Sequence, residues 1–98
     1  MITIITILSG GTGTPKLLQG IKEVIDPGEI RIIVNTGEDL KQSGVLISPD
    51  IDTVTYTMAN IIDQEKWYGI EDDTYHFHNT MKNLGKEELL TIGDKDRA

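Results

Sequence analysis

A glycine-rich turn near the N-terminus is the first feature of the sequence that could do chemistry. The segment ILSGGTGTPKLL (residues 7–18) runs from an apolar stretch into a proline, a lysine and two leucines. Glycines let a backbone approach phosphate oxygens, and the free N–H groups and dipole of a following helix attract negative charge. The donors available are the groups of Gly10, Gly11, Thr12, Gly13 and Thr14, with Lys16 in the first helical turn. The turn therefore predicts a site for a phosphate-bearing ligand.

This turn matches neither of the two common phosphate-binding signatures. A Walker A loop has glycine before its lysine and serine or threonine after it, whereas Lys16 lies between Pro15 and Leu17. The dinucleotide fingerprint needs glycine or alanine at the position of Lys16 and an acidic residue at the position of Asn35. Neither ATP hydrolysis by a P-loop nor a standard NAD site is expected. A tight strand-to-helix turn without any ligand is the alternative interpretation.

Acidic residues follow the second apolar run and begin a later helix. Glu38 and Asp39 lie in NTGED, and Asp50 and Asp52 lie in SPDID. Strands that run parallel open their carboxyl ends on one edge, which would bring Glu38 and Asp39 near the phosphate site. Mg²⁺ would relieve the repulsion, because it takes one or two carboxylates together with phosphate oxygens. The four acids are therefore candidate metal ligands, and solvated acids or acids favoured by a helix dipole are the alternative.

The spacing of Asp50 and Asp52 places a further constraint on this site. At about 100° per residue, the two side chains point about 200° apart around a regular helix that starts at Pro49. Both are then not expected to face one site. We expect Asp50 to satisfy the first turn of the helix and Asp52 to face the ligand or metal.

Other polar and aromatic residues have less specific patterns. His76 and His78 are two residues apart on a predicted helix, so they point to opposite faces and are interpreted as ordinary helix residues. Trp67 and Tyr68 are expected to pack against the sheet, with a platform for a planar ligand as the alternative. The final segment GDKDRA is interpreted as either a capped turn or a polar site.

The elements that must position these residues begin with a β–loop–α–β unit. The nearly continuous apolar runs at residues 2–8 and 30–34 are typical of buried strands in a parallel sheet. Between them, a helix is predicted from Pro15 to Ile25, with a stop at residues 26–28. The apolar stripe of that helix comprises Leu17, Leu18, Ile21, Val24 and Ile25.

The second half of the chain predicts a loop, two further helices and a short helical piece. Residues 35–50 are polar and glycine-bearing and predict a loop. Ser48 and Pro49 predict the start of a helix. Its expected buried stripe is Ile51, Val54, Met58, Ile61 and Ile62. A third helix is expected to be capped by Asp73 or Thr74 and to end at Gly85, and residues 86–90 predict a short helical piece.

Composition limits the classes of function. Ninety-eight residues with 38% hydrophobic content suit one small α/β domain of modest stability. A net charge of −7 without any basic stripe disfavours nucleic-acid binding. The absence of cysteine excludes disulfides and thiolate chemistry. The N-terminal apolar run is too short for a membrane span and lacks a preceding charge, so a cytoplasmic protein without a membrane partner is expected.

Five segments together resemble the archaeal 2-phospho-L-lactate transferases of coenzyme F420 biosynthesis. In chain order they are LSGGTGTPKLLQG, VNTGEDL, ISPDIDTVTY, WYGIEDDT and IGDKDRA. The resemblance implies a Rossmann-like, three-layer α/β fold with a parallel sheet and flanking helices. It also implies Mg²⁺-dependent transfer of a 2-phospholactyl group from lactyl-2-diphospho-5′-guanosine to 7,8-didemethyl-8-hydroxy-5-deazariboflavin, which releases GMP and gives coenzyme F420-0.

The resemblance also implies roles for particular residues. Gly10 to Thr14, with Lys16 and Asn35, would bind the donor, and Glu38 and Asp52 are the candidate catalytic and metal-binding residues. Asp52 and Thr91 would contact the deazaflavin, although the position of Thr91 is usually basic in that family. Members of the family are longer, so residues 1–98 are expected to be the N-terminal part of one domain and inactive alone; a homodimer is compatible with the sequence.

A related family of bacterial gluconeogenesis factors gives the alternative function. Its members share the glycine turn and bind nucleotide sugars as regulators without catalysis. The segments GEDL, SPDIDT and GDKDR favour the transferase.

Overall fold

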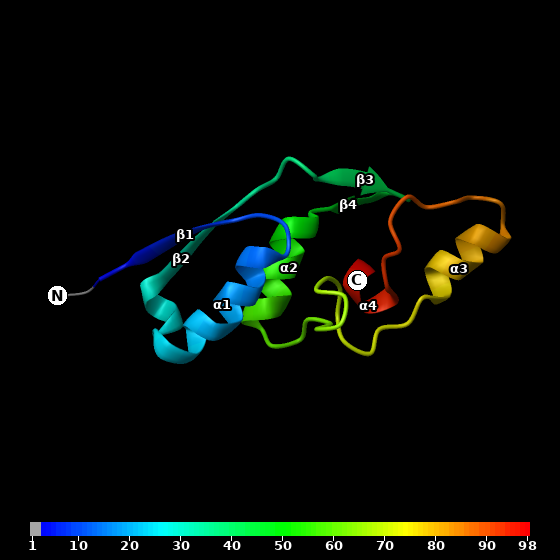
Figure 1. Cartoon of the computed structure of the whole chain (residues 1–98). Helices are drawn as coiled ribbons and strands as arrows, with labels where there is room; N and C mark the ends of the chain where they lie inside the picture. Colours follow the sequence, from blue (N-terminus) through cyan, green and yellow to red (C-terminus); the bar gives the residue numbers. More distant parts are fainter. Residues whose placement is uncertain (1–2) are drawn as a thin grey trace.

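The two apolar runs predicted as strands pair with each other in the computed structural model of the protein, which describes residues 3–98 (Figure 1). Strand β1 (Ile5–Ser9) lies parallel to β2 (Ile30–Val34), with Ile5 opposite Ile30 and Ser9 opposite Val34. Helix α1 (Gly13–Val24) and the 3₁₀ turn η1 (Pro27–Glu29) connect the strands. The predicted β–loop–α–β unit and the α/β class are therefore confirmed.

Among residues 3–98, helices cover one face of the sheet. Helix α1 and helix α2 (Pro49–Met58) lie side by side beneath the strands (Figure 1). Leu8 and Ile33, which are partners in the strand register, are 74% and 59% exposed on the other face. The expectation that both strands are buried was wrong for this face, because the described residues supply a helix layer on one side of the sheet.

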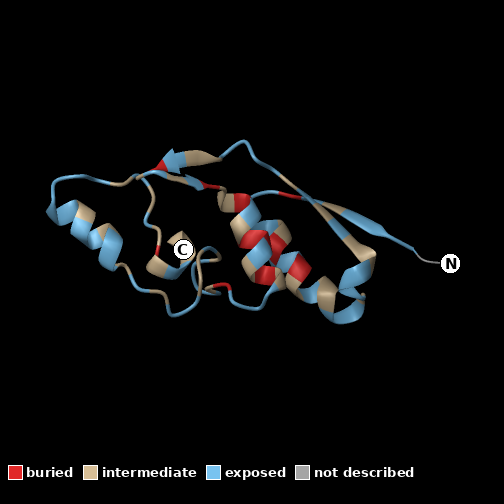
Figure 2. Ribbon diagram, turned by 180° about the vertical axis from the view of Figure 1, so that it is seen from behind, coloured by how far each residue is buried: buried red, intermediate tan, exposed pale blue. Residues whose placement is uncertain are grey.

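The contact between α1 and α2 forms the core of this end of the molecule (Figure 2). Leu18 of α1 is completely buried, and the inner face of α2 presents Val54 with Thr53 and Thr57. The threonine hydroxyls are satisfied inside the helix, since Thr53 donates to the carbonyl of Pro49 at 2.8 Å and Thr57 to that of Thr53 at 2.7 Å. Small β-branched residues thus bury their methyl groups without leaving a hydroxyl unpaired.

The apolar stripes predicted for these helices are only partly correct. Of the stripe on α1, Leu17 and Val24 are exposed. Of the stripe expected for the second helix, Ile51 and Ile61 are exposed, and α2 ends at Met58 before Ile61 and Ile62. The periodic patterns mark more apolar surface than two packed helices can cover. At 15.3 Å the radius of gyration exceeds the ~13 Å typical of a compact chain of this length.

Residues 40–47 form a β-hairpin where a loop was expected. Strands β3 (Leu40–Gln42) and β4 (Val45–Ile47) pair antiparallel across the turn residues Ser43 and Gly44, whose φ angles are 48° and 83°. Two residues with positive φ give a turn whose twist matches that of the flanking strands. The strands are too short for their alternation to stand out in the sequence.

Two short helices at the other end cap one another. Helix α3 (His76–Asn83) receives its cap from Asp94 of helix α4 (Asp94–Arg97), whose carboxylate accepts the N–H groups of His76 and Phe77 at 3.0 Å each. Asp73, which precedes α3, instead accepts the N–H groups of Lys95 and Asp96 in α4. The prediction that Asp73 or Thr74 caps the third helix was therefore wrong. Each of the two aspartates caps the helix that the other one adjoins: Asp94 caps α3, and Asp73 caps α4.

The exchange requires glycine at position 93. A Cβ atom added to Gly93 would collide with the carboxylate of Asp73. Gly85 ends α3 with a φ of 87°, and Lys86 then donates its N–H to the carbonyl of Met81, which confirms the predicted stop. Residues 86–90 form no helix, contrary to the prediction.

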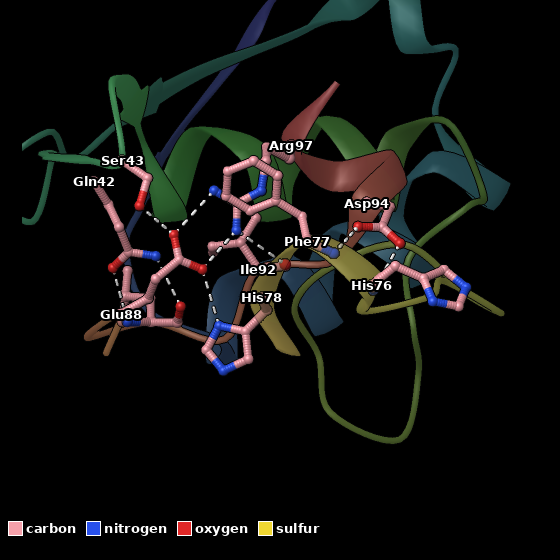
Figure 3. Close-up of polar contacts among 10 residues, drawn as sticks. Gln42, Ser43, His76, Phe77, His78, Glu88, Ile92, Asp94 and Arg97 are labelled. Carbon is pink, nitrogen blue, oxygen red and sulfur yellow. Dashed lines mark hydrogen bonds and ion pairs between the residues drawn. The ribbon is translucent and has the colours of Figure 1, made fainter. Parts of the chain in front are cut away.

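Glu88 joins three elements through a buried network (Figure 3). Its side chain is 1% exposed and accepts hydrogen bonds from both terminal nitrogens of Arg97, at 3.1 and 2.8 Å. The Ser43 hydroxyl donates to it at 2.5 Å, and His78 Nδ1 lies 3.0 Å away. Arg97 also stacks on the Phe77 ring, 3.9 Å from its centre. The hairpin, α3 and α4 are therefore held to one carboxylate, and His78 has a structural role.

Stability should depend on pH through Glu88. Burial alone raises the pKa of Glu88, but hydrogen bonds from Arg97, Ser43 and His78 outweigh it and lower this pKa from 4.5 to about 2. The ionised form is thus favoured by folding, so its stabilisation is complete above pH 4.5 and is lost as the pH falls toward 2. We expect Glu88→Gln to lower the free energy of unfolding at pH 7 by about 3 kcal/mol, because Arg97 loses its partner.

Chemical denaturation between pH 2 and 7 measures both effects. The neighbouring exposed glutamate gives the matched control Glu87→Gln, which should follow the wild type at every pH. The free energy of unfolding of Glu88→Gln should still depend on pH to some extent. The reason is that the pKa of Asp94 is also lowered to about 2, by the Thr74 hydroxyl and the N–H groups of Phe77 and His76. A Glu88→Gln curve parallel to that of the wild type would contradict this role of Glu88.

Candidate functional site

Two hollows lie near the carboxyl ends of β1 and β2. The larger, here called the main cleft, has a volume of about 600 Å³ and reaches from the glycine turn to α4. The smaller, here called the strand-end hollow, has a volume of about 530 Å³ and lies against the ends of the strands. Gly11, Glu38 and Asp50 line both hollows. The glycine turn and the predicted acids therefore do meet at one place, as the order of the elements predicts.

Asp50 is the residue that holds this junction together. Its carboxylate is almost fully buried, accepts the N–H of Gly11 at 3.2 Å on one oxygen and accepts the Asn35 amide at 3.1 Å on the other. Asn35 in turn accepts the N–H of Gly37 at 3.1 Å, which fixes the orientation of its amide. The turns that follow β1 and β2 are thus joined through the first turn of α2.

The glycine turn already binds an anionic group. Gly11 has a φ of 62°, which turns its N–H toward the Asp50 carboxylate. Thr12, at the N-cap of α1, makes no side-chain capping bond, so its hydroxyl accepts no hydrogen bond from the first-turn N–H groups of α1. One donor of the turn is therefore used within the chain, and the predicted phosphate site stays a prediction.

The main cleft has an apolar wall supplied by two segments. The hairpin contributes Leu40 and Ile47, and the loop before α4 contributes Leu89, Leu90 and Ile92. Gln42, which is buried, clamps that loop: its amide donates to the Leu90 carbonyl at 2.8 Å and accepts the Leu90 N–H at 2.9 Å. Thr91, next to Leu90, lines the cleft, and its contact with a deazaflavin stays a prediction.

The polar side of the main cleft is acidic. Glu38, Asp50, Asp52 and Asp96 line it, and no lysine, arginine or histidine is among its described lining residues. Burial, followed by repulsion from Asp96 and then Asp39, raises the pKa of Asp52 from 3.8 to about 6. The cleft therefore suits a ligand that brings hydrogen-bond donors or a cation.

Asp96 is held in the cleft by a tyrosine. The Tyr56 hydroxyl donates to Asp96 Oδ1 at 2.6 Å. Burial, and then this bond to the carboxylate, raise the pKa of Tyr56 above its ordinary value, so the phenol stays protonated and remains a donor. Asp96 was not predicted as a site residue; the only signal was that GDKDRA could form a polar site.

The remaining predicted residues are distributed around this junction. Gly10 lines the strand-end hollow with Asn35. Gly13 and Thr14 form the first turn of α1 but line neither hollow. Lys16 lies with its ammonium group 5.6 Å from the centre of the Trp67 ring and also lines neither hollow. Their proposed contacts with a donor phosphate stay predictions.

Three expectations about the site differ from the structure. Asp50 and Asp52 both line the main cleft, although opposite directions were predicted. Side chains of a first helical turn lean toward the N-terminus, so both can reach the space beyond the helix end. Asp50 bonds the neighbouring turns and not its own first turn, as was expected. Tyr68 lines the main cleft and was expected to pack on the sheet, so the alternative of a platform for a planar ligand fits it better.

The acids fit a magnesium ion that is bound partly by a substrate. No group of three or more metal-ligating side chains is preassembled among residues 3–98. Mg²⁺ needs only one or two carboxylates when phosphate oxygens and water complete its shell. Glu38 and Asp52 line the cleft, and Asp39, whose Oδ2 accepts the Ser48 hydroxyl, has a buried Oδ1 without a hydrogen-bond partner. This donor set suits a cation that arrives with a phosphate.

Replacing Asp50 by asparagine should loosen the junction. Asparagine offers one oxygen, so its NH₂ group would face either the Gly11 N–H or the Asn35 amide, and one charge-assisted hydrogen bond would be lost. We expect the free energy of unfolding to fall by about 1.5–3 kcal/mol. Denaturation at pH 7 measures the change.

The control for this variant is Asp26→Asn. Asp26 accepts only the Gly28 N–H through Oδ1, which asparagine can also do, so its stability should be unchanged. Equal stabilities of Asp50→Asn and the wild type would mean that the two bonds of Asp50 do not support the fold.

Residues 3–98 contain no helix with both the length and the apolar character that crossing a bilayer requires. A family model described as 2-phospho-L-lactate transferase CofD matches residues 5–96. Over 98 residues the chain is 58% identical to the 2-phospho-L-lactate transferase of Methanocaldococcus jannaschii, which covers 100% of this chain and 32% of that protein. Over 96 residues it is 60% identical to that of Methanothermobacter thermautotrophicus, covering 98% and 31%.

The chain thus spans about a third of the length of the curated relatives that it matches. The matched region includes the glycine turn, the Asp50 junction and the main cleft with α4. Because the family model extends over nearly the whole chain, this chain belongs to the 2-phospho-L-lactate transferase family.

Proposed function

We propose that the chain forms the N-terminal, substrate-binding part of a 2-phospho-L-lactate transferase of coenzyme F420 biosynthesis. The donor would be lactyl-2-diphospho-5′-guanosine and the acceptor 7,8-didemethyl-8-hydroxy-5-deazariboflavin. The observation that carries the proposal is the meeting of two hollows at Gly11, Glu38 and Asp50, in a chain of this family. Two hollows that share Gly11 of the glycine turn would allow one substrate to lie in each, with the reacting groups meeting at the junction.

The proposed arrangement follows the chemistry of the two hollows. The donor's diphosphate would lie at the junction, against the N–H groups and hydroxyls of residues 10–14, with Asn35 beside it. The planar deazaflavin would lie in the main cleft, between Tyr68 and the apolar wall, near Asp52 and Thr91. An aromatic ring system suits an apolar cleft with a few polar groups at its end.

In the transfer, the acceptor's hydroxyl oxygen forms a bond to the phosphorus that carries lactate. The bond from that phosphorus to the bridging oxygen breaks, and its electron pair leaves with GMP. The hydroxyl proton passes to Asp52, a carboxylate that lines the main cleft. Glu38, at the junction, would help to orient the donor. Positioning and charge neutralisation provide most of the rate in such reactions.

Mg²⁺ is part of the proposal. Glu38, with Asp39 beside it in the chain, would hold it together with the donor's phosphates. When bound it neutralises phosphate charge that the acids of the junction would otherwise repel. The chain's own residues bind, orient and accept the proton.

A chimera tests the function directly. In it, this chain replaces the matching N-terminal third of the Methanocaldococcus jannaschii transferase, to which it is 58% identical. We expect the chimera to form GMP and the phospholactylated deazaflavin only when Mg²⁺ is present, and the 98-residue chain alone to be inactive. Saturable binding of UDP-sugars without any binding of deazaflavin would instead support a nucleotide-sugar-binding regulator.

Replacing Asp52 by asparagine should slow the chemical step. Asparagine keeps the size of the side chain but cannot accept the proton, so kcat in the chimera should fall by about 10²–10⁴-fold. Steady-state kinetics at saturating Mg²⁺ measures the change, and near-UV circular dichroism checks the fold. Asp72→Asn, at an exposed position that lines neither hollow, is the matched control and should retain full activity. Unaltered kcat in Asp52→Asn would show that Asp52 is structural.

A further inference from the structure

Asp96 brings a charge into the main cleft from a distant part of the chain. It lies in α4, whereas the other acids of the cleft come from the segment between β2 and α2 and from α2. No cationic side chain is among the described residues that line the cleft, and the charges of Asp96 and Asp52 repel one another. A carboxylate without a charged partner is stabilised when a ligand donates hydrogen bonds to it.

The side chain of Asp96 is held with one oxygen available. Oδ1 accepts the Tyr56 hydroxyl at 2.6 Å, and no hydrogen bond to Oδ2 exists within the described residues. The backbone is fixed as well, because the Asp96 N–H bonds Asp73 at 3.0 Å. A Cβ atom at Gly69 would lie 3.8 Å from Oδ2, so the glycine leaves space next to that oxygen. The result is a fixed carboxylate at the wall of the cleft, with one oxygen that accepts no hydrogen bond from the described residues.

Tyr56 connects this acceptor to the helix that carries Asp52. The two residues are four apart on α2 and so lie on one face of the helix, one turn from each other. Tyr56 is thus placed to set where Asp96 lies relative to Asp52. Phenylalanine at this position would keep the packing but release the carboxylate.

The chemistry of the cleft selects the kind of group that Asp96 would contact. An anionic phosphate is disfavoured beside an uncompensated carboxylate, and an apolar group would leave the carboxylate unpaired. A neutral hydroxyl donates a hydrogen bond and meets both conditions. Of the two proposed substrates, the acceptor carries such hydroxyls, on the polyol chain attached to its ring.

We propose that Asp96 is a specificity-determining residue that accepts a hydrogen bond from a hydroxyl of the acceptor's polyol chain, and that Tyr56 is the residue that positions it. This inference rests on the proposed function, since it takes the main cleft as the acceptor site. A site built to bond a hydroxyl rejects an analogue that lacks it, because its polar group is then left unpaired. Asp96 would therefore distinguish a polyol-bearing deazaflavin from one without hydroxyls.

Binding measurements in the chimera test the proposal without requiring turnover. Fluorescence titration gives the Kd of two ligands, the natural deazaflavin and the same ring with a methyl group in place of the polyol. Asp96→Asn turns an NH₂ group toward the ligand if its oxygen keeps the Tyr56 bond, so the charge-assisted bond from the hydroxyl is replaced at best by a weaker neutral one. We expect the Kd of the natural ligand to rise about tenfold or more, and that of the methyl analogue to stay unchanged.

Tyr56→Phe should also raise the Kd of the natural ligand and leave that of the methyl analogue unchanged. The rise should be smaller than in Asp96→Asn, because the Asp96 carboxylate remains present. Asp72→Asn is the control and should change neither Kd. Equal weakening of both ligands by Asp96→Asn would mean a structural role and would overturn the proposal, as would no change in either. Absence of saturable deazaflavin binding by the unmutated chimera would instead overturn the proposed function, and this inference with it.

Discussion

The site depends on one buried carboxylate. Asp50 lies in the first turn of α2, yet its hydrogen bonds go to the turn after β1 and to the residue after β2. Through it, the turns that follow β1 and β2 are both joined to the first turn of α2. Burying this charge is costly unless its oxygens are hydrogen-bonded. Each oxygen accepts one hydrogen bond, and the bond from Gly11 fixes the glycine turn.

A second set of polar contacts forms the cleft beside that junction. Asp73 and Asp94 exchange caps between α3 and α4, and Glu88 joins both helices to the hairpin. These bonds, together with the Gln42 clamp on Leu90, bring the last residues of the chain against α2. The half of the molecule that carries Thr91 and Asp96 is therefore organised mainly by charge-assisted hydrogen bonds, because its buried apolar side chains are few.

The apolar surface outside these contacts is large for a chain of this size. The outer face of the sheet exposes Leu8 and Ile33, and α1 exposes Leu17 and Val24. Relatives that are about three times as long have further chain available to cover such faces. This supports the proposal that residues 1–98 belong to a larger single domain, in which the glycine turn and the cleft are one side of the complete site.

The sequence by itself determined the β–loop–α–β unit, the parallel class of the sheet, the start of α2 and the stop of α3. These depend on neighbouring residues: β-branched runs, proline in a first turn, and glycine at positive φ. It also indicated that the glycine turn and the acids after β2 meet, because parallel strands share an edge. Only the tertiary structure decided which partner each carboxylate takes. Asp50, Asp73, Asp94 and Asp96 were all visible as acids, but their bonds cross to other elements. Local spacing carries no information about such contacts, since they are set by how the elements pack.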